Sequence, residues 1–420
     1  LVSNPRLLHL LAEIMGAAPK LAETLSRRPR VIDAVLEPAF FDRVPSEADL
    51  RTRLHAFLGE ATAYEEKLDR ARIFAQEQLF LIGVRIITGT LSVTGAGVAY
   101  ATLAGLLVAT ALEIVEAEME RAHGRVPGGA AAVVAMGKLG GREMTAASDL
   151  DLMLLYDFDA EADQSDGPKP LAPGQYYARL TQRLIAAISA PTAEGAIYAV
   201  AFRLRPPGNK GPVATRLAAF REYHAKEAWT WEHMALTRAR VIAGPPAFAA
   251  EVEAAVRAAL VAPRASAKLR ADVVEMRGMI QAEKGTKDIW DIKQVAGGLV
   301  DIEFVAQYLM LAHAEAHPDL PATNTAVALH RLAERDLLPP AEADILLPAV
   351  RLYQALTQIL RLVHDGAFDP AGAPRGLVDL LLRAAEVPDL GVLQATLKET
   401  QSEVRAVFER LVGRVKHREA

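Results

Sequence analysis

Two aspartates stand one residue apart in a segment that is otherwise apolar. The segment SDLDLMLLYD covers residues 148–157 and contains Asp149 and Asp151. Alternate residues of a β-strand point to the same face, so the two carboxylates would stand side by side, with Leu150 and Leu152 on the other face. Unpaired carboxylates this close repel each other and are costly to remove from water. The pattern therefore predicts a positively charged partner between them.

A glycine-rich stretch precedes the acid pair. The sequence GKLGG at 137–141 contains three glycines, which allow close backbone approach and can direct amides at an anion, and Lys138 adds a positive charge. Aspartate oxygens are ligands suited to Mg²⁺. An anion-binding loop beside a metal site is what a nucleoside triphosphate requires, because the metal bridges phosphate oxygens and neutralises developing charge. We therefore predict that the positive partner is Mg²⁺, brought with the nucleotide.

Two commoner phosphate-binding motifs do not account for this stretch. The G-x-x-x-x-G-K-[ST] order of a Walker loop is absent. A dinucleotide fingerprint opens a helix, whereas we expect this loop to lead towards the acidic strand. Asp-x-Asp alone, or a glycine-rich turn alone, is most often ordinary structure. Their succession between two apolar strands favours a functional site.

The elements that must position these residues fall into three regions. Residues 1–125 have apolar side chains at three-and-four spacing, which predicts helices. Residues 126–245 contain three short strand-like segments and one amphipathic helix, which predicts an α+β or α/β domain. These are the strands 130–137, 148–157 and 194–205, and the helix 175–189. Residues 246–420 return to helical periodicity and predict a bundle.

Composition limits the kind of protein. The net charge of −5 gives no electrostatic reason to expect nucleic acid, and the lack of cysteine excludes disulfides and thiolate sites and fits a reducing cytoplasm. Residues 86–112 carry no charge, but glycine and hydroxyl residues interrupt them before Val98, so we expect a buried helix and no membrane span. We expect a cytoplasmic protein, and we interpret the missing initiator Met as the mark of a fragment.

The longer stretch GKLGGREMTAASDLDLMLLYD resembles the signature of the nucleotidyltransferase superfamily that includes DNA polymerase β, in the form carried by glutamine synthetase adenylyltransferase. Four other stretches match the same family. They are SNPRLLHLLAEIMGAAPKLAETLSRRP (3–29), FRLRPPGNKGP (202–212), EAWTWEHMALTRARVIAGP (227–245) and DIKQVAGGLVDIEF (291–304). The resemblance implies an α+β fold, in which a polymerase β-like mixed-sheet domain at 126–245 lies between N-terminal helices (1–125) and a C-terminal helical bundle (246–420).

The family is bifunctional. One half transfers AMP from ATP to a tyrosine of glutamine synthetase, and the other removes it by phosphorolysis. The stretch EAWTWEHMALTRAR resembles the adenylylating, C-terminal half. The resemblance implies ATP as substrate, Mg²⁺ as cofactor, and three partners: glutamine synthetase, the PII signal protein and the deadenylylating half of the same longer chain. The phosphorolytic half and a catalytically silent nucleotide-binding module remain open as alternatives.

Site residues follow from the same resemblance. Asp149 and Asp151 correspond to the two metal-binding carboxylates of the family. Arg203 and Arg205 fall in its R-L-R-P segment, where they would pair with phosphate or with active-site acids. The residues assigned to the nucleotide are Gly137, Lys138, Gly140, Gly141 and Ser148.

One position departs from the family pattern. The family normally reads Y-E-V-D-x-R-L-R-P, whereas this chain reads Y-A-V-A-F-R-L-R-P, with Ala199 and Ala201 in place of two acids. The third acid usually completes the metal site and helps to deprotonate the attacking hydroxyl. Its loss predicts that the fold and the ATP site are retained and catalysis is impaired. An engineered inactive variant, a degenerate natural enzyme and a substitute acid nearby all remain open.

Two further pairs invite a structural interpretation. We expect Trp229 and Trp231 to pack between the catalytic and helical regions. The resemblance places Asp301 and Glu303 near the active cleft, but on a helix acids two apart do not share a face. We therefore expect these acids to support the site from outside it or to be structural.

Overall fold

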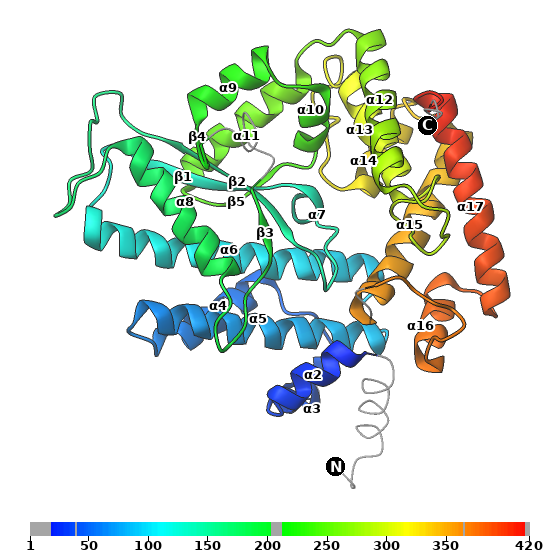
Figure 1. The fold of residues 1–420 in the computed structure, drawn as a ribbon, viewed down its shortest axis with the longest axis horizontal. Coiled ribbons are helices and arrows are strands. Elements are labelled where there is room, and N and C mark those ends of the chain that lie inside the picture. Colours follow the sequence, from blue (N-terminus) through cyan, green and yellow to red (C-terminus); the bar gives the residue numbers. More distant parts are fainter. Residues whose placement is uncertain (1–17, 38–39, 203–211, 364–365, 416–420) are drawn as a thin grey trace.

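The computed structural model describes residues 18–37, 40–202, 212–363 and 366–415 (Figure 1). Over these residues helices surround one sheet of five strands, so the predicted α+β class is confirmed. Arg203 and Arg205 lie outside the described residues, as do residues 1–17 of the N-terminal region predicted to be helical.

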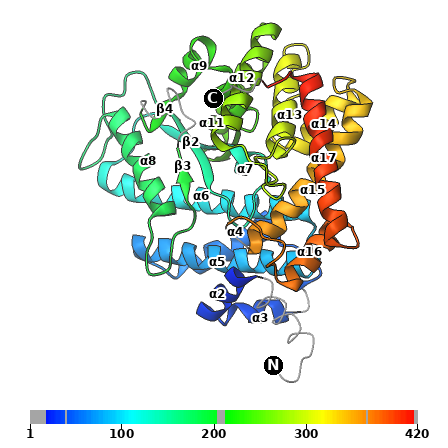
Figure 2. The same ribbon diagram turned by 45° about the vertical axis from the view of Figure 1, so that its right-hand side comes forward.

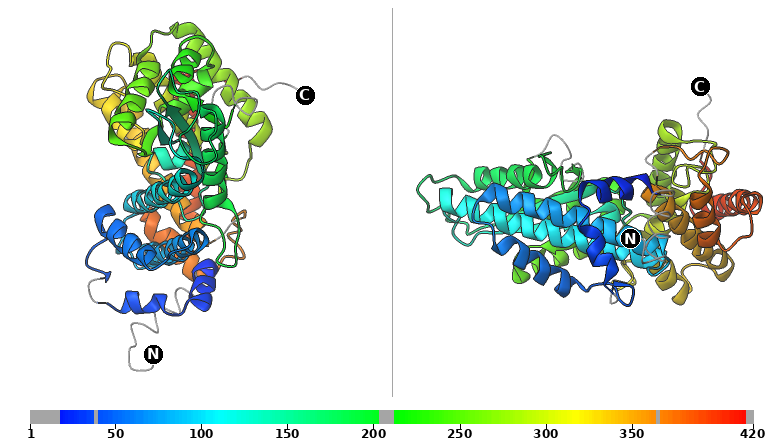
Figure 3. Two further views of the ribbon diagram at one scale, coloured as in Figure 1. Left: turned by 90° about the vertical axis from the view of Figure 1, so that its left-hand side faces the viewer. Right: turned by 90° about the horizontal axis from the view of Figure 1, so that it is seen from below.

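Five helices precede the sheet in the described part of the chain. They are α2 (Pro19–Arg27), α3 (Val31–Leu36), α4 (Glu47–Gly59), α5 (Tyr64–Ile87) and α6 (Val93–His123). Helix α6 packs against α4 and α5 on one side and against β5 and α8 on the other. In Figure 3 it therefore forms the layer between the N-terminal helices and the sheet.

Helix α6 is the one element of the described chain that is long and apolar enough to cross a membrane. It begins at Val93, where the Ser92 side chain caps it by accepting a hydrogen bond from Gly95 N, so our expectation of a helix only from Val98 onward was wrong. Of its most apolar 18-residue window, 67% is buried inside the fold. Packing against the sheet and the neighbouring helices accounts for its hydropathy, as expected for a buried helix.

The sheet is mixed and has β2 (Leu150–Asp157) at its centre. Strand β1 (Ala130–Ala135) is antiparallel to β2 and to β5 (Arg240–Ala243). Along its other edge β2 pairs in parallel with β3 (Val200–Ala201) near its start and with β4 (Ala214–Arg216) near its end. The predicted strands at 130–137 and 148–157 are confirmed, and of the third, at 194–205, the described part forms only β3.

Five helices of the described chain lie between and after the strands, and all of them except α10 pack on the sheet. They are α7 (Gly137–Gly140), α8 (Pro173–Ser189), α9 (Leu217–Lys226), α10 (Thr230–Leu236) and α11 (Pro246–Val261). Helix α8 confirms the amphipathic helix expected at 175–189, and its apolar face is buried.

The remaining helices form the C-terminal region, at the right of Figure 1 and forward in Figure 2. They are α12 (Ser266–Lys284), α13 (Leu299–His313), α14 (Thr325–Glu334), α15 (Pro340–Val363), α16 (Arg375–Ala385) and α17 (Leu390–Leu411). Helix α15 contacts α6 and α2, so the C-terminal region packs directly on the N-terminal helices. The division into domains at 125 and 245 stays a prediction.

Candidate functional site

The acid pair lies at the start of the central strand. Asp149 directly precedes β2 and is exposed, and Asp151 is the second residue of the strand and half-buried. Leu150 and Leu152 are fully buried, so the predicted alternation of faces is confirmed. The amide of Met136, at the end of β1, donates to the carbonyl of Asp151 at 2.9 Å. The carboxylates therefore stand where β1 leaves the sheet and the glycine-rich segment begins.

Ala201 lies beside Asp151 in the sheet. Strand β3 runs parallel to β2 with Val200 in register with Leu150 and Ala201 in register with Asp151. The amide of Leu150 donates to the carbonyl of Ala199 at 2.9 Å and fixes this register. In the part of the chain that the structure describes, no group of three or more His, Asp or Glu lies close enough to hold a metal ion. The described donor set at this edge is thus two carboxylates.

The glycine-rich segment is a turn of helix, α7, where we expected a loop. The amides of Gly140 and Gly141 donate to the carbonyls of Met136 and Gly137 at 2.9 and 3.1 Å. The expectation that these two amides point at an anion was therefore wrong. Amides in the first turn of a helix have no partner within the helix, so those of Gly137, Lys138 and Leu139 are the available donors.

Glycine is required at 137 by its contact with the acid pair. Gly137 has φ +52°, and a Cβ added there would lie 2.5 Å from Oδ2 of Asp151. Its turn is therefore packed directly on the carboxylate. Gly140 is constrained by packing instead, because a Cβ there would overlap the carbonyl oxygen of Arg238. Gly141 faces the guanidinium of the same arginine.

Ser148 closes the turn that leads into the acid pair. Its hydroxyl oxygen accepts a hydrogen bond from the amide of Thr145 at 2.9 Å and lies 3.1 Å from the Thr145 hydroxyl. The side chain is 8% exposed. In this structure Ser148 positions Asp149, and any contact with a nucleotide stays a prediction.

Lys138 is half-buried among other cations. Burial, followed by the positive charge of Lys293, lowers the pKa of Lys138 to about 8, and the nearby Glu303 opposes that shift. Arg361 and Arg238 contribute further positive charge at the same place. Clustered cations beside a pair of carboxylates suit a polyphosphate, which would bring negative charge to the lysines.

Arg238 is a residue of the candidate site that the sequence reasoning missed. It lies between α10 and β5, is 6% exposed, and donates from Nε to the carbonyl of Gly137 at 2.9 Å. Its other nitrogens form ion pairs with Glu143 and, at 2.9 Å, with Glu303 of α13. Glu143 in turn accepts from the amide of Thr325 at 2.8 Å. Arg238 thus connects the glycine turn to α13 and α14. The stretch 227–245 that contains Arg238 matched the family, but its residue spacing did not indicate a contact with the glycine turn.

The remaining expectations have mixed outcomes. Asp301 is fully buried and pairs with Arg277 and, at 3.3 Å, with Arg405, so it is structural, whereas Glu303 reaches the glycine turn through Arg238. Trp229 is 69% exposed, so its expected packing between the regions was wrong.

The fold and site define a mixed-sheet α+β protein with a carboxylate pair packed on a cation-rich glycine turn. Residues 8–255 match the sequence model of the glutamate-ammonia ligase adenylyltransferase family, and the chain belongs to this family. Residues 274–412 match a second model, described as GlnD PII-uridylyltransferase.

Three relatives illustrate the similarity, each named bifunctional glutamine synthetase adenylyltransferase/adenylyl-removing enzyme. That of Xanthobacter autotrophicus is 54% identical over 410 residues, which are 97% of this chain and 42% of the relative. Those of Rhodopseudomonas palustris and Brucella suis are 51% and 52% identical over 98% of this chain, again with 42% of each relative covered. The chain thus spans less than half the length of these relatives.

Proposed function

We propose that this chain is an adenylylating half of the bifunctional enzyme, which transfers AMP from ATP to a tyrosine of glutamine synthetase and thereby regulates nitrogen assimilation. The 42% coverage of the relatives supports the assignment to one half of the longer enzyme, and the resemblance of the EAWTWEHMALTRAR stretch supports the transferring half. The mixed sheet, with Asp-x-Asp at the start of its central strand, supports a polymerase β-like nucleotidyltransferase domain.

The observation that carries this proposal is the contact between Gly137 and Asp151. A Cβ at 137 would lie 2.5 Å from the carboxylate, so the first-turn amides of α7 and the acid pair share one small region. The amides suit phosphate oxygens, and the carboxylates suit a divalent cation. A nucleoside triphosphate with its metal ion is the ligand that needs both at this separation.

The residues present fit one Mg²⁺ ion. Mg²⁺ commonly takes one or two protein carboxylates and completes its shell with water and substrate phosphates, and Asp149 and Asp151 supply such a pair. When bound, the ion would neutralise charge on the phosphates during transfer. A second ion would need the third carboxylate, which Ala201 does not provide.

The chain's own residues act mainly by positioning and charge. Lys138 and Lys293 attract the phosphates, and the first-turn amides of α7 orient them. Arg238 holds the glycine turn against α13 through Gly137 and Glu303, so the α7 amides stay fixed relative to the acid pair. Holding ATP and the tyrosine hydroxyl together supplies much of the rate enhancement without a base.

One observation favours a second candidate function. Because Ala201 is in register with Asp151, the acid expected to accept the tyrosine proton is missing. A chain that binds ATP and its protein partners without transferring AMP would show the same geometry. The partners in either case are glutamine synthetase, the PII signal protein and the deadenylylating half of the longer chain.

The test uses ATP labelled at the α-phosphate, Mg²⁺ and unmodified glutamine synthetase. Adenylyl transfer places label on a tyrosine of the synthetase, at a rate above that of a sample without this chain. ATP binding by calorimetry with no label on the synthetase would establish the silent module. Neither binding nor transfer would refute both candidates.

A further inference from the structure

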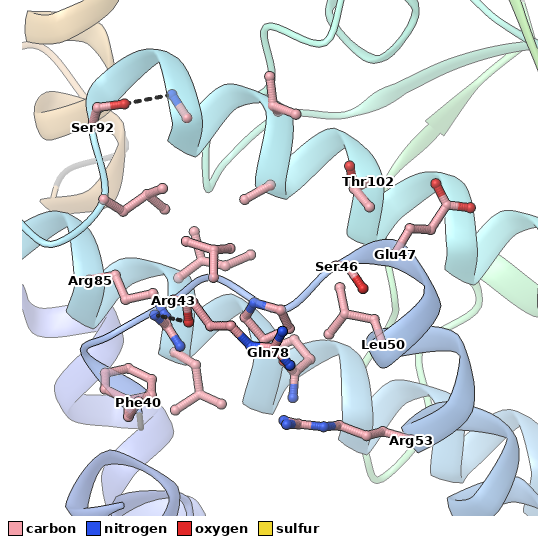
Figure 4. Close-up of a pocket in the computed structure, with 18 of the residues that line it drawn as sticks. Phe40, Arg43, Ser46, Glu47, Leu50, Arg53, Gln78, Arg85, Ser92 and Thr102 are labelled. Atoms are coloured by element: carbon pink, nitrogen blue, oxygen red, sulfur yellow. Dashed lines mark hydrogen bonds between the residues drawn. The ribbon is translucent and has the colours of Figure 1, made fainter. Parts of the chain in front are cut away.

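A cavity lies away from the acid pair, between α4, α5, α6 and residues 40–46, which precede α4 (Figure 4). Its volume is about 760 Å³, within the range typical of small-molecule sites. Much of its wall is apolar. The larger apolar side chains are Phe40, Val44, Leu50, Leu81, Ile82, Leu91 and Val98.

Four arginines line the same cavity: Arg43, Arg53, Arg85 and Arg142. Figure 4 shows the first three across the cavity from Ser92 and Thr102 of α6. Among the described residues, Arg43 pairs with Asp49 at 3.3 Å, and the other three have no carboxylate partner. The acids of the lining are Glu37 and Glu47, and Glu47 is engaged by Arg51 at 3.0 Å. The cavity therefore carries excess positive charge.

Arg85 is the most informative of the four because it is only 4% exposed. Its Nη1 donates to the carbonyl of Arg43 at 2.9 Å, and its guanidinium lies 4.0 Å from the centre of the Phe40 ring. Burial, and then the charge of Arg53, lower the pKa of Arg85. A buried cation without an anionic partner is costly, and a bound anion would offset that cost.

The long helix α6 also begins at this cavity. Its N-cap Ser92 and the first-turn residues Thr94 and Gly95 are part of the lining. The amide of Gly95 is capped by the Ser92 side chain, and the amides of Val93 and Thr94, which have no partner within the helix, lie at the positive end of the dipole of this 31-residue helix. This feature adds to the arginine charge on the opposite wall.

We propose that this cavity binds a small organic anion that has an apolar chain and one carboxylate or phosphate head group. The chain would lie against the apolar wall formed by residues such as Leu81 and Val98, and the head group would meet Arg53 and Arg85. An uncharged ligand would leave the arginines unpaired, and a small inorganic anion would leave the apolar wall in water.

The cavity is connected to the glycine turn. Arg142 follows Gly141 directly, has φ +56°, and lines the cavity. Gly97 of α6 packs so closely on this segment that an added Cβ would lie 3.1 Å from the Arg142 carbonyl oxygen. An occupant that shifts α6 or Arg142 would therefore change the turn at Gly137–Gly141. This coupling rests on the proposed function, whereas the binding itself does not.

The test is calorimetric titration of the whole chain with octanoate, octyl phosphate and neutral 1-octanol, without ATP or synthetase. At least one anion should bind about 10-fold or more tightly than octanol, since each charge-assisted hydrogen bond contributes on that scale. Binding of octanoate alone or of octyl phosphate alone identifies the head group. Octanol binding as tightly as both anions would overturn the proposal.

Substitutions of residues that line the cavity test whether the anion binds there. Arg53→Gln on the exposed rim and Val98→Trp, which fills the cavity, should each weaken anion binding about 10-fold or more. Arg121→Gln, at the far, exposed end of α6, is the matched control and should bind normally. Arg85→Gln should abolish binding; if that variant fails to fold, Arg53→Gln and Val98→Trp still decide. Equal affinity in wild type, Arg53→Gln and Val98→Trp would refute the site.

The coupling has its own readout. ATP affinity in Mg²⁺ should differ about 5-fold or more between the free chain and the chain saturated with the better anion. An unchanged ATP affinity would overturn the coupling. If no anion binds, the anion site is refuted and the proposed adenylyl transfer is not affected. If no AMP is transferred, the proposed function is refuted and the anion site is not affected, so the two proposals are tested separately.

Discussion

Ala201 on β3 lies in register with Asp151 on β2, in the parallel pair at the edge of the central strand. Side chains in register on neighbouring strands share a face and are close enough to act on one ligand. A carboxylate at 201 would therefore stand beside Asp151 and complete a cluster of three. The chain keeps the strand, its register and the other two acids and lacks only this side chain.

The acid pair should carry the metal dependence of ATP binding. Replacing both residues, as Asp149→Asn with Asp151→Asn, should abolish the tightening of ATP binding by Mg²⁺ and leave the fold intact, because amides do not replace two anionic ligands. Calorimetric titration with and without Mg²⁺ measures this. A control variant of two exposed acids, Glu161→Gln with Asp163→Asn, removes the same charge elsewhere. It should retain the tightening of ATP binding by Mg²⁺. Unchanged Mg²⁺ dependence in the first variant would exclude this site.

Gly137→Ala should be destabilising and should weaken ATP binding. The substitution combines a positive φ with a Cβ 2.5 Å from the Asp151 carboxylate, so a loss of about 1–3 kcal/mol in unfolding free energy is expected. Gly105→Ala in the middle of α6 meets no atom within 4 Å and should stabilise by about 0.5–1 kcal/mol. Denaturant titration compares them. Equal effects would contradict the packing of the turn on Asp151.

ATP affinity should fall as the pH rises through about 8, the pKa of Lys138. The protonated ammonium binds phosphate, so bound ATP raises the lysine pKa, and affinity is lost above the pKa of the free chain. Between pH 7 and 9 the loss should reach up to about 10-fold, since one pH unit corresponds to a tenfold change in protonation. Lys138→Arg keeps its charge and should show a flat profile, which also corrects for the titration of ATP. The same dependence of ATP affinity on pH in the unaltered chain and in Lys138→Arg would show that Lys138 does not bind the phosphates.

Arg238→Met should destabilise the protein by about 3–5 kcal/mol, because it leaves Glu143 and Glu303 buried without their cation. Arg121→Met breaks an ion pair of a 76% exposed arginine with Glu118 and should cost about 1 kcal/mol or less. Thermal and denaturant unfolding measure both. Similar losses in the two variants would show that the network does not hold the glycine turn.

The two activities of the family give opposite expectations for adenylylated glutamine synthetase. Incubated with that substrate and phosphate, this chain should release no ADP, because its motifs match the transferring half. Chromatography of the nucleotides detects the product. Robust phosphate-dependent release of ADP would assign the chain to the adenylyl-removing half.

Local patterns predicted the long, periodic elements well. The apolar run at 130–137, the alternation around Asp151 and the amphipathic helix at 175–189 each depend on neighbours in sequence, and the structure has all three. The strands β4 and β5 have three and four residues, too few for a period to show. They form because β4 pairs with β2 and β5 pairs with β1.

In the candidate site, too, contacts between neighbours in sequence were predicted and contacts between distant residues were not. The acid pair and Gly137 are adjacent elements of one motif, so spacing alone brought them together. The turn of helix at Gly137–Gly140 contradicts the low helix propensity of glycine, and it is held by Arg238, about 100 positions away. That contact depends on how α10, α13 and the glycine turn pack, which no local pattern records. The prediction that Trp229 is buried was wrong because a large apolar residue need not be buried.

The most direct test of the account is the initial rate of AMP incorporation into glutamine synthetase at saturating ATP and Mg²⁺. It compares the unaltered chain with Ala201→Asp and Ala199→Glu. A general base contributes about 10²–10⁴ in rate, so Ala201→Asp should raise transfer by at least about 10²-fold. Ala199→Glu should do much less, because only Ala201 is in register with Asp151. A fast unaltered chain to which Ala201→Asp adds nothing would show that another acid fills the role, and would contradict the account.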